Sequence, residues 1–322
     1  MKKWICAALV ALLVIGLLAG CAAPQPSSTK KSVVVTVFPI YDWVMELLGD
    51  KADEWDVIFL LDNGVDLHSY QPTAEDMVKI AACDLFIYVG GNSDAWVADA
   101  LKGAANPDQK SINLMEILGD AAKEEEIVEG MEAEEEEEEE EGGIEYDEHV
   151  WLSLRCTESF VSSIASTLSA IDAENAAVYA ANALNYIGEL TALDAEYAAA
   201  VASAARTTVL FGDRFPFRYL TDDYGLTYYA AFVGCSAESE ASFETVVFLA
   251  GKVDELQLPA VLALEGTDHS LAQTIVDNTA DKSAQIVVMN SMQSTTAKDA
   301  GAGATYLQIM KDNLEALKIA LN

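Results

Sequence analysis

The segment that decides the fold reads AENAAVYAANALNYIGELTALDAEYAAAVASA and runs from Ala173 to Ala204. It contains no proline, and its larger apolar residues recur three or four positions apart, which is the spacing of one helix face. Asp172 can cap its start, and Glu174 lies in the first turn. The pattern predicts one helix of about 30 residues, roughly 45 Å long, that ties two parts of the chain together. Gly188 leaves a second interpretation open, in which two shorter helices meet there.

Apolar, β-rich runs lie on both sides of this helix, and helical patterns follow them. Continuous apolar runs are typical of parallel strands that are covered on both faces. The predicted strands are Val33–Phe38, Asp56–Leu61 and Leu85–Val89 before the helix, and Thr207–Phe211, Thr227–Phe232, Ala260–Leu264 and Gln285–Met289 after it. We therefore predict an α/β protein of two lobes with their own cores, each built on a parallel four-stranded sheet. The lobes are expected at residues 33–172 and 205–322, with the connecting helix at 173–204.

The first residues carry an export pattern. Two lysines precede an apolar run from Trp4 to Leu18, and the sequence Leu-Ala-Gly-Cys then ends at Cys21. A run of about 15 residues is short for a membrane span, and the ending resembles the lipobox of bacterial lipoproteins. We expect a signal peptide at residues 1–20, a lipid on Cys21 and a flexible polar tether at residues 21–32. The protein would then be anchored by this lipid at the extracytoplasmic face of the cell membrane; an uncleaved anchor helix is the alternative.

Acidic residues dominate the charge, with 53 Asp and Glu against 18 Lys and Arg and a formal net charge of −35. This balance repels nucleic acids and anionic lipids and attracts cations, so no nucleic-acid partner is expected. The segment Lys123–Glu148 contains eight consecutive glutamates, Glu134–Glu141. Charge this dense cannot bury a core, so residues 123–148 are predicted to form a disordered loop. The loop is either a solvated insertion or a weak cation collector beside a binding site.

Histidine is rare, with three residues in a chain of 322. His68 follows the predicted strand Asp56–Leu61, and His149 lies where the acidic segment ends. Open α/β sheets bind ligands beyond the carboxyl ends of their strands, and imidazole is a common metal ligand. From the residues alone, a lone histidine is more often a structural or surface residue than a metal ligand. Three cysteines remain after the signal segment and the lipid site, and neither a thiolate metal motif nor a disulfide can be assigned to Cys83, Cys156 and Cys235.

At these histidines the sequence resembles the zinc and manganese substrate-binding lipoproteins of ABC importers, the metal-binding adhesin lipoproteins. The stretch His68-Ser-Tyr-Gln-Pro-Thr73 is similar to the family's first ligand motif, and Asp147-Glu-His-Val-Trp-Leu152 to its second. The opening strand with its aromatic pair and the closing helix also match, so that the resemblance covers nearly the whole chain after the tether. It implies His68 and His149 as metal ligands in a cleft between two α/β lobes.

The ligands of the second lobe are less clear from this resemblance. The family's third ligand position corresponds to Gly212, which has no side chain. We predict Asp213 as the substitute, although its neighbour Arg214 offers it a structural salt bridge instead. Glu265, which ends the strand Ala260–Leu264, is predicted as a further ligand. The remaining alternatives are Glu240, His269 and Asn290.

Two imidazoles with carboxylate oxygens suit zinc or manganese, and zinc is favoured because the affinity of such sites rises from manganese to zinc. The resemblance implies a monomeric binding protein that delivers the metal to an ABC importer, whose membrane permease and cytoplasmic ATPase are separate chains. An enzyme is not expected, because His-Glu-x-x-His, Gly-x-Ser-x-Gly and P-loop patterns do not occur in the sequence. A surface adhesin with a structural metal and a zinc-dependent hydrolase are the alternatives.

Overall fold

The computed structural model describes residues 30–132, 145–236 and 241–322. Of these, Ser32–Asn322 belong to one compact unit. The predicted signal peptide, Cys21 and nearly all of the tether lie outside the described residues, as do the eight glutamates and Glu240. Within the described ranges, no helix has both the length and the apolar character that a membrane span requires.

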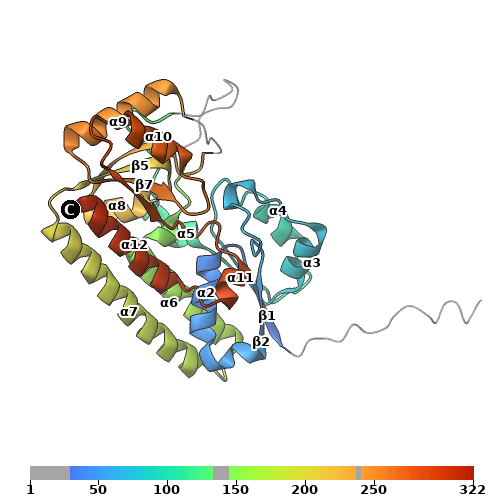
Figure 1. Cartoon of the computed structure of the whole chain (residues 1–322). Coiled ribbons are helices and arrows are strands. Elements are labelled where there is room, and N and C mark those ends of the chain that lie inside the picture. The colour runs from blue at the N-terminus through green and yellow to red at the C-terminus, as the bar shows by residue number, and fades with distance from the viewer. Residues whose placement is uncertain (1–29, 133–144, 237–240) are drawn as a thin grey trace, which may run out of the picture. The chain divides into compact units, whose positions relative to one another are not determined.

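Two parallel four-stranded sheets organise the chain, which confirms the predicted fold class (Figure 1). The first sheet has the order β2-β1-β3-β4, and its strands are β1 (Lys31–Val35), β2 (Trp55–Phe59), β3 (Leu85–Tyr88) and β4 (Lys110–Asn113). The predicted strand Val33–Phe38 is too long, because Pro39 lies in the first turn of the next helix, where a missing N–H costs nothing. Strand β4 was not identified from the sequence, since Ile112 is its only apolar residue.

The second sheet has the order β6-β5-β7-β8, and its strands are β5 (Thr208–Phe215), β6 (Thr227–Val233), β7 (Ala260–Leu264) and β8 (Gln285–Met289). Strands β7 and β8 have the predicted bounds. Strand β5 is longer than predicted and irregular. Phe211 pairs with Ala230 of β6, and Arg214 pairs with Phe232, so three residue steps on β5 lie opposite two on β6. One extra residue on β5 changes which side chains face which side of the sheet, and this affects the candidate site below.

Helices cover both sheets. They are α2 (Phe38–Leu48), α3 (Ala74–Ala82), α4 (Val97–Lys102), α5 (Leu114–Leu118), α6 (Leu154–Ile171), α7 (Ala176–Ser203), α8 (Arg218–Tyr224), α9 (Phe243–Leu256), α10 (Ser270–Asn278), α11 (Ala297–Gly301) and α12 (Tyr306–Leu321). Short 3-10 turns are η1 (Gly49–Glu54), η2 (Leu67–Ser69), η3 (Gly119–Ala121) and η4 (Val150–Leu152). Thr73 caps α3 as expected, and Asp76 completes a reciprocal capping box.

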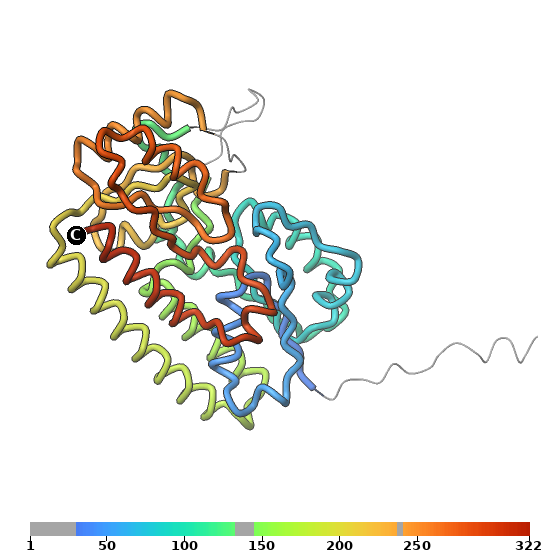
Figure 2. The backbone as a smooth tube through the Cα atoms, in the orientation of Figure 1, coloured from blue at the N-terminus to red at the C-terminus, as the bar shows by residue number. Residues whose placement is uncertain are grey.

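The long helix α7 runs unbroken through Gly188 (Figure 2), so the single-helix prediction is confirmed. Its 28 residues span about 42 Å. The helix begins at Ala176, three residues later than predicted, because Asp172 ends α6 and does not cap α7. The Asp172 carboxylate accepts a hydrogen bond from the Tyr179 hydroxyl at 2.6 Å. Helices α2, α6 and α12 pack against α7.

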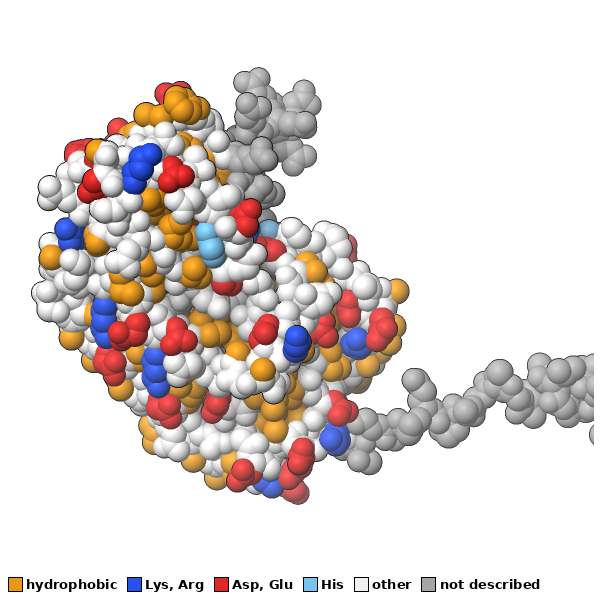
Figure 3. Space-filling view, viewed as in Figure 1, with side chains coloured by type: hydrophobic (Ala, Val, Ile, Leu, Met, Phe, Trp, Pro, Cys, Tyr) orange, Lys and Arg blue, Asp and Glu red, His pale blue; other side chains and the backbone are white. Residues whose placement is uncertain are grey.

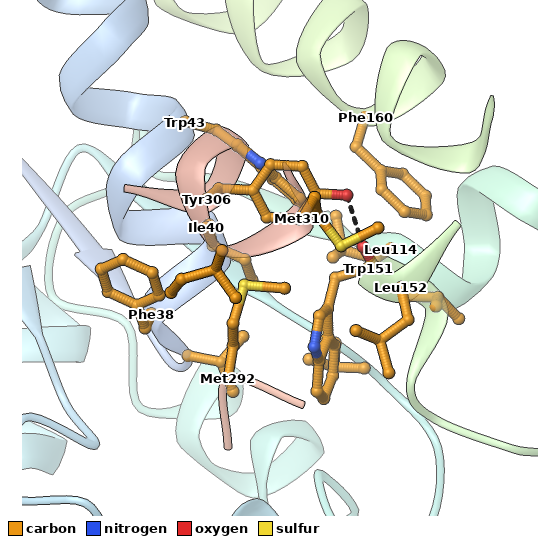
Figure 4. Close-up of a cluster of buried hydrophobic side chains, with 14 of the residues drawn as sticks. Phe38, Ile40, Trp43, Leu114, Trp151, Leu152, Phe160, Met292, Tyr306 and Met310 are labelled. Atoms are coloured by element: carbon orange, nitrogen blue, oxygen red, sulfur yellow. Dashed lines mark hydrogen bonds between the residues drawn. The ribbon is translucent and has the colours of Figure 1, made fainter. Parts of the chain in front are cut away.

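A continuous apolar core joins the two sheets, which differs from the expectation of separate cores. It extends from β1 and β3 through α2, α6, α7 and α12 to one face of the second sheet. A smaller cluster lies on the other face, under α9 and α10. Figure 4 shows Trp43, Phe160 and Tyr306 around Trp151, whose carbonyl accepts a hydrogen bond from the Tyr306 hydroxyl at 2.7 Å. The segment after His149 is therefore anchored in the core.

The prediction of a disordered loop at residues 123–148 is wrong for its two ends. The Lys123 backbone N–H donates to the Tyr219 hydroxyl at 3.0 Å, and Glu124 forms an antiparallel bridge with Tyr146. The Glu132 N–H donates to the Ala231 carbonyl at 2.9 Å. Residues 123–132 and 145–148 are thus paired with ordered parts of the chain, a pairing that their acidic composition hides.

Replacing Gly188 by Ala should raise the free energy of unfolding by about 0.5–1 kcal/mol. Gly188 lies inside α7, and an added Cβ would meet no heavy atom within 4 Å. The matched variant Gly212→Ala should instead lower the free energy of unfolding, because its Cβ would lie 2.6 Å from the Ala272 Cα. Urea denaturation measures both changes. A destabilised Gly188→Ala variant would contradict an unbroken, unobstructed helix at this position.

Candidate metal centre

His68 lies in η2, the turn that follows β2, with 13% of its side chain exposed. Asp66 caps this turn, because its Oδ1 accepts a hydrogen bond from the His68 backbone N–H at 3.0 Å. The His68 Nδ1 lies 2.8 Å from the Ser93 Oγ and 3.5 Å from the Glu148 Oε2. These oxygens fix the ring so that its Nε2 faces His149.

His149 is fully buried in the turn that leads into η4 and α6. The Oδ1 of Asp147 lies 3.0 Å from its Nδ1 and accepts its backbone N–H at 2.8 Å. Two residues later, the Trp151 indole N–H donates to the Ser291 carbonyl at 2.8 Å. The Trp151 ring also stands edge-on to the imidazole, with ring centroids 5.4 Å apart. The core thus sets the position of this histidine.

The Nε2 atoms of His68 and His149 lie 3.2 Å apart. Each Nδ1 faces an oxygen, which favours a proton on Nδ1 and leaves the Nε2 lone pair free. Two lone pairs that point at each other repel unless a positive charge lies between them. The pair therefore has the geometry of two ligands to one shared cation.

Burial and nearby carboxylates control protonation of the pair. Burial and the neighbouring His149 lower the pKa of His68 to about 3. Burial also disfavours charged His149, but Asp147, Asp66 and Glu148 outweigh this effect and raise its pKa. A divalent cation that binds these ring nitrogens must displace any proton they carry. On the face shown in Figure 3, acidic side chains are dispersed and do not gather in one patch.

The structure does not bring Asp213 and Glu265 to the histidine pair. The Asp213 Oδ2 accepts hydrogen bonds from the Leu264 N–H at 3.2 Å and from the Thr267 hydroxyl at 3.3 Å. The Glu265 carboxylate accepts from the Ser291 N–H and hydroxyl, both at 2.8 Å. Asp213 ties strand β5 to the end of β7 and the loop after it, and Glu265 ties that loop to the one after β8, which is a structural role.

The alternative ligands are also engaged elsewhere. His269 is half-buried, and its Nδ1 lies 3.1 Å from the Thr267 hydroxyl. The Asn290 Oδ1 accepts from the Met292 N–H at 2.7 Å. Glu240 lies outside the described residues.

Gly212, which the sequence comparison placed at the third ligand position, does not face the histidine pair. It faces α10, where it contacts Ala272. The extra residue in β5 makes Arg214 the strand residue that approaches the pair. Its Nη1 lies 3.1 Å from the Asp66 Oδ2 and donates to the Ser236 carbonyl at 3.2 Å. Arg214 therefore pairs with Asp66, whereas Asp213 accepts the Arg214 backbone N–H at 2.9 Å.

Two residues that the sequence analysis did not select lie beside the pair. The potential ligand atoms of His68, His149 and Cys235 all lie within 4.8 Å of one another. The Gln293 amide oxygen lies 3.1 Å from the His149 Nε2 when its amide nitrogen faces Asp66. Cys235 follows a predicted strand, as His68 does, and that placement was a usable signal. Gln293 had none, since an amide is a weak metal ligand.

Replacing Asp213 by Asn should lower the free energy of unfolding by about 1–3 kcal/mol, because an NH2 group would face the Leu264 N–H. Zinc affinity should stay within about threefold of the wild-type value. Urea denaturation of the metal-free protein and zinc titration separate the two effects. Asp120→Asn, at an exposed position, is the matched control and should change neither quantity. A large loss of zinc affinity with unchanged stability would show that Asp213 is a metal ligand.

Comparisons with known proteins agree with a metal centre. The family profile described as "Zinc-uptake complex component A periplasmic" matches residues 33–320. The zinc-binding lipoprotein AdcA of Streptococcus pneumoniae is 31% identical over 303 residues, which cover 94% of this chain and 58% of that protein. The chain thus spans less than two thirds of that relative. The high-affinity zinc uptake system protein ZnuA of Bacillus subtilis is 30% identical over 312 residues, 93% of each chain.

A solved structure has the same fold. The Zn(II)-bound ZnuA-like domain of Streptococcus pneumoniae AdcA superimposes with a TM-score of 0.70 at 28% identity, covering 91% of this chain and 99% of that domain. The agreement extends across both sheets, because nearly all of each chain is covered.

Proposed function

The chain belongs to the family of periplasmic A components of zinc-uptake complexes, and on this premise we propose that it captures zinc outside the cytoplasmic membrane and delivers it to an ABC importer. The observation that carries the proposal is the buried histidine pair, whose Nε2 atoms lie 3.2 Å apart. His68 and His149 bind the zinc ion through these atoms. The names of two relatives, a zinc-binding lipoprotein and a zinc uptake protein, support zinc over manganese.

Capture follows from the arrangement around the pair. Asp147 orients His149, and Ser93 with Glu148 orients His68, so little reorganisation is needed when zinc binds. Groups from both halves of the chain surround the ion, and its binding therefore stabilises the state in which they are together. Since α7 is unbroken and packs against α2, α6 and α12, release requires small tilts of these elements and no wide hinge opening.

The proposal includes the partners and the location. The importer's membrane permease and cytoplasmic ATPase are separate chains, and the binding protein acts as a monomer. A lipid on Cys21 keeps it at the extracytoplasmic face of the membrane. Support comes from the Leu-Ala-Gly-Cys sequence and from a relative that is named a lipoprotein. The family is one of transport components, so binding and release, without catalysis, account for the site.

Growth under zinc limitation tests the proposal in cells. Cells that lack this protein should grow poorly when zinc is chelated, and the wild-type gene should restore growth and zinc content. A gene with both His68→Ala and His149→Ala should fail to restore them, although the variant protein is present at the membrane. Restored zinc uptake by the double variant would refute the role of the pair in transport.

A further inference from the structure

A sulfur ligand lies beside the histidine pair. The Cys235 Sγ and one ring nitrogen each of His68 and His149 lie within 4.8 Å of one another. We infer that Cys235 is the third zinc ligand and that its thiolate makes the site prefer zinc to manganese. The inference rests on the proposed function, because it concerns the same site.

The turn after β6 brings Cys235 to the pair. A Cβ on Gly234 would lie 2.8 Å from the Phe215 carbonyl oxygen and 3.0 Å from the His149 Cε1. Only a residue without a side chain lets the turn lie this close to the imidazole. The Cys235 backbone N–H donates to the Glu125 Oε1 at 3.2 Å, which holds the turn in place. The close approach at Gly234 and the position of the sulfur are thus two consequences of one local structure.

The histidine pair supplies an independent indication of a cation. Both Nδ1 atoms face oxygens, so both Nε2 lone pairs are directed at the same point. The Cys235 thiol, whose sulfur lies within 4.8 Å of a ring nitrogen of each histidine, adds a third potential electron-pair donor. Asp213 and Glu265, the carboxylates predicted for this place, are held by Leu264 and Ser291 instead. Cys235 is therefore the ligand that the second half of the chain contributes.

The other cysteines in the described part of the chain differ from Cys235. All three are free of disulfides there. The buried Cys83 thiol donates to the Ile80 carbonyl at 3.2 Å, inside the first half of the chain. Cys156 lies in the first turn of α6, and neither it nor Cys83 belongs to the group of close potential ligands. Cys156 is thus a matched control for a cysteine with no role in metal binding.

A thiolate ligand changes which metal ion the site prefers. Sulfur is a soft ligand that zinc accepts readily, whereas manganese favours carboxylate, carbonyl and water oxygens. On binding, a sulfur–zinc bond forms, and the thiol proton leaves to solvent. Arg214 lies 3.1 Å from the Asp66 carboxylate and offsets part of its charge. With its amide nitrogen toward Asp66, Gln293 brings its oxygen to 3.1 Å from the His149 Nε2.

Cobalt(II), a spectroscopic substitute for zinc, tests the inference in the reduced full-length protein. The wild-type protein and Cys156→Ser should show a near-ultraviolet thiolate-to-cobalt charge-transfer band. Cys235→Ser should lose the band while keeping visible bands from cobalt bound by the histidines. In competition titrations, the ratio of zinc to manganese affinity should fall by at least about tenfold in Cys235→Ser only. Cys235→Ala provides the same readings if the serine variant does not fold.

The outcomes separate this inference from the proposed function. If wild-type protein binds neither zinc nor cobalt, the proposed function fails. If it binds both ions without the charge-transfer band, or if the band persists in Cys235→Ser, the thiolate is not a ligand and only this inference is overturned. An unchanged preference for zinc over manganese in both Cys235 variants would also overturn it.

Discussion

Replacing His68 and His149 together by Ala is expected to weaken zinc binding by more than about a hundredfold. Each single replacement should cost at least about tenfold, or about 1.4 kcal/mol. The reason is geometric, because the two Nε2 atoms are 3.2 Å apart and each ring is fixed through its Nδ1. Removing one ring leaves no other imidazole within reach. Competition titration against a zinc chelator at constant pH measures the loss.

His269→Ala is the matched control, because it removes the third histidine of the chain. Its half-buried ring lies beside Thr267 and does not belong to the group of close potential ligands. Zinc affinity should therefore remain within about twofold of the wild-type value. The melting temperature of each metal-free variant shows whether folding is intact. A double variant that binds zinc as tightly as the wild-type protein would place the site elsewhere.

The sequence allowed prediction of the half of the site that depends on local signals. His68 and His149 were selected because the short motifs around them resemble the ligand motifs of a known family; their positions after a strand and at the end of the acidic segment alone did not decide it. Cys235 was not selected, although it also follows a predicted strand. Arg214 was not selected, because its position depends on the pairing of β5 and β6. The extra residue between Phe211 and Arg214 changes which side chains approach the pair. No pattern within β5 alone reveals this shift, since it depends on the partner strand.

In the fold, too, elements with a local sequence signal were predicted, and elements that depend on pairing with distant residues were not. Strands β7 and β8 were predicted with their observed bounds because both consist mainly of apolar residues between turn signals. Strand β4 was missed because it lies at a sheet edge, beside β3 only, and needs little apolar surface. The ends of the acidic segment looked disordered by composition, but Glu124 and Glu132 pair through their backbones. Backbone pairing of this kind cannot be predicted from the charge of the side chains.

Trp151→Ala should lower the free energy of unfolding by about 3–5 kcal/mol, because it leaves a large cavity in the core. Trp151 has no exposed surface, and its indole N–H donates to the Ser291 carbonyl at 2.8 Å. Urea denaturation of metal-free protein measures the change. Leu184→Ala is the control, since this apolar side chain of α7 is 74% exposed and its loss should cost less than about 0.5 kcal/mol. Equal stability of the two variants would show that Trp151 does not support the core.

The same variant links the core to the metal site. In the wild-type protein, zinc at about 100 times its dissociation constant should add about 2.7 kcal/mol to the free energy of unfolding. At the same zinc concentration, the gain should be smaller in Trp151→Ala, because the Trp151 ring packs against His149 and fixes the turn that carries it. Leu184→Ala should keep the full gain. If zinc stabilises Trp151→Ala as much as the wild-type protein, the position of His149 is set by Asp147 alone and the core contact is not needed for binding.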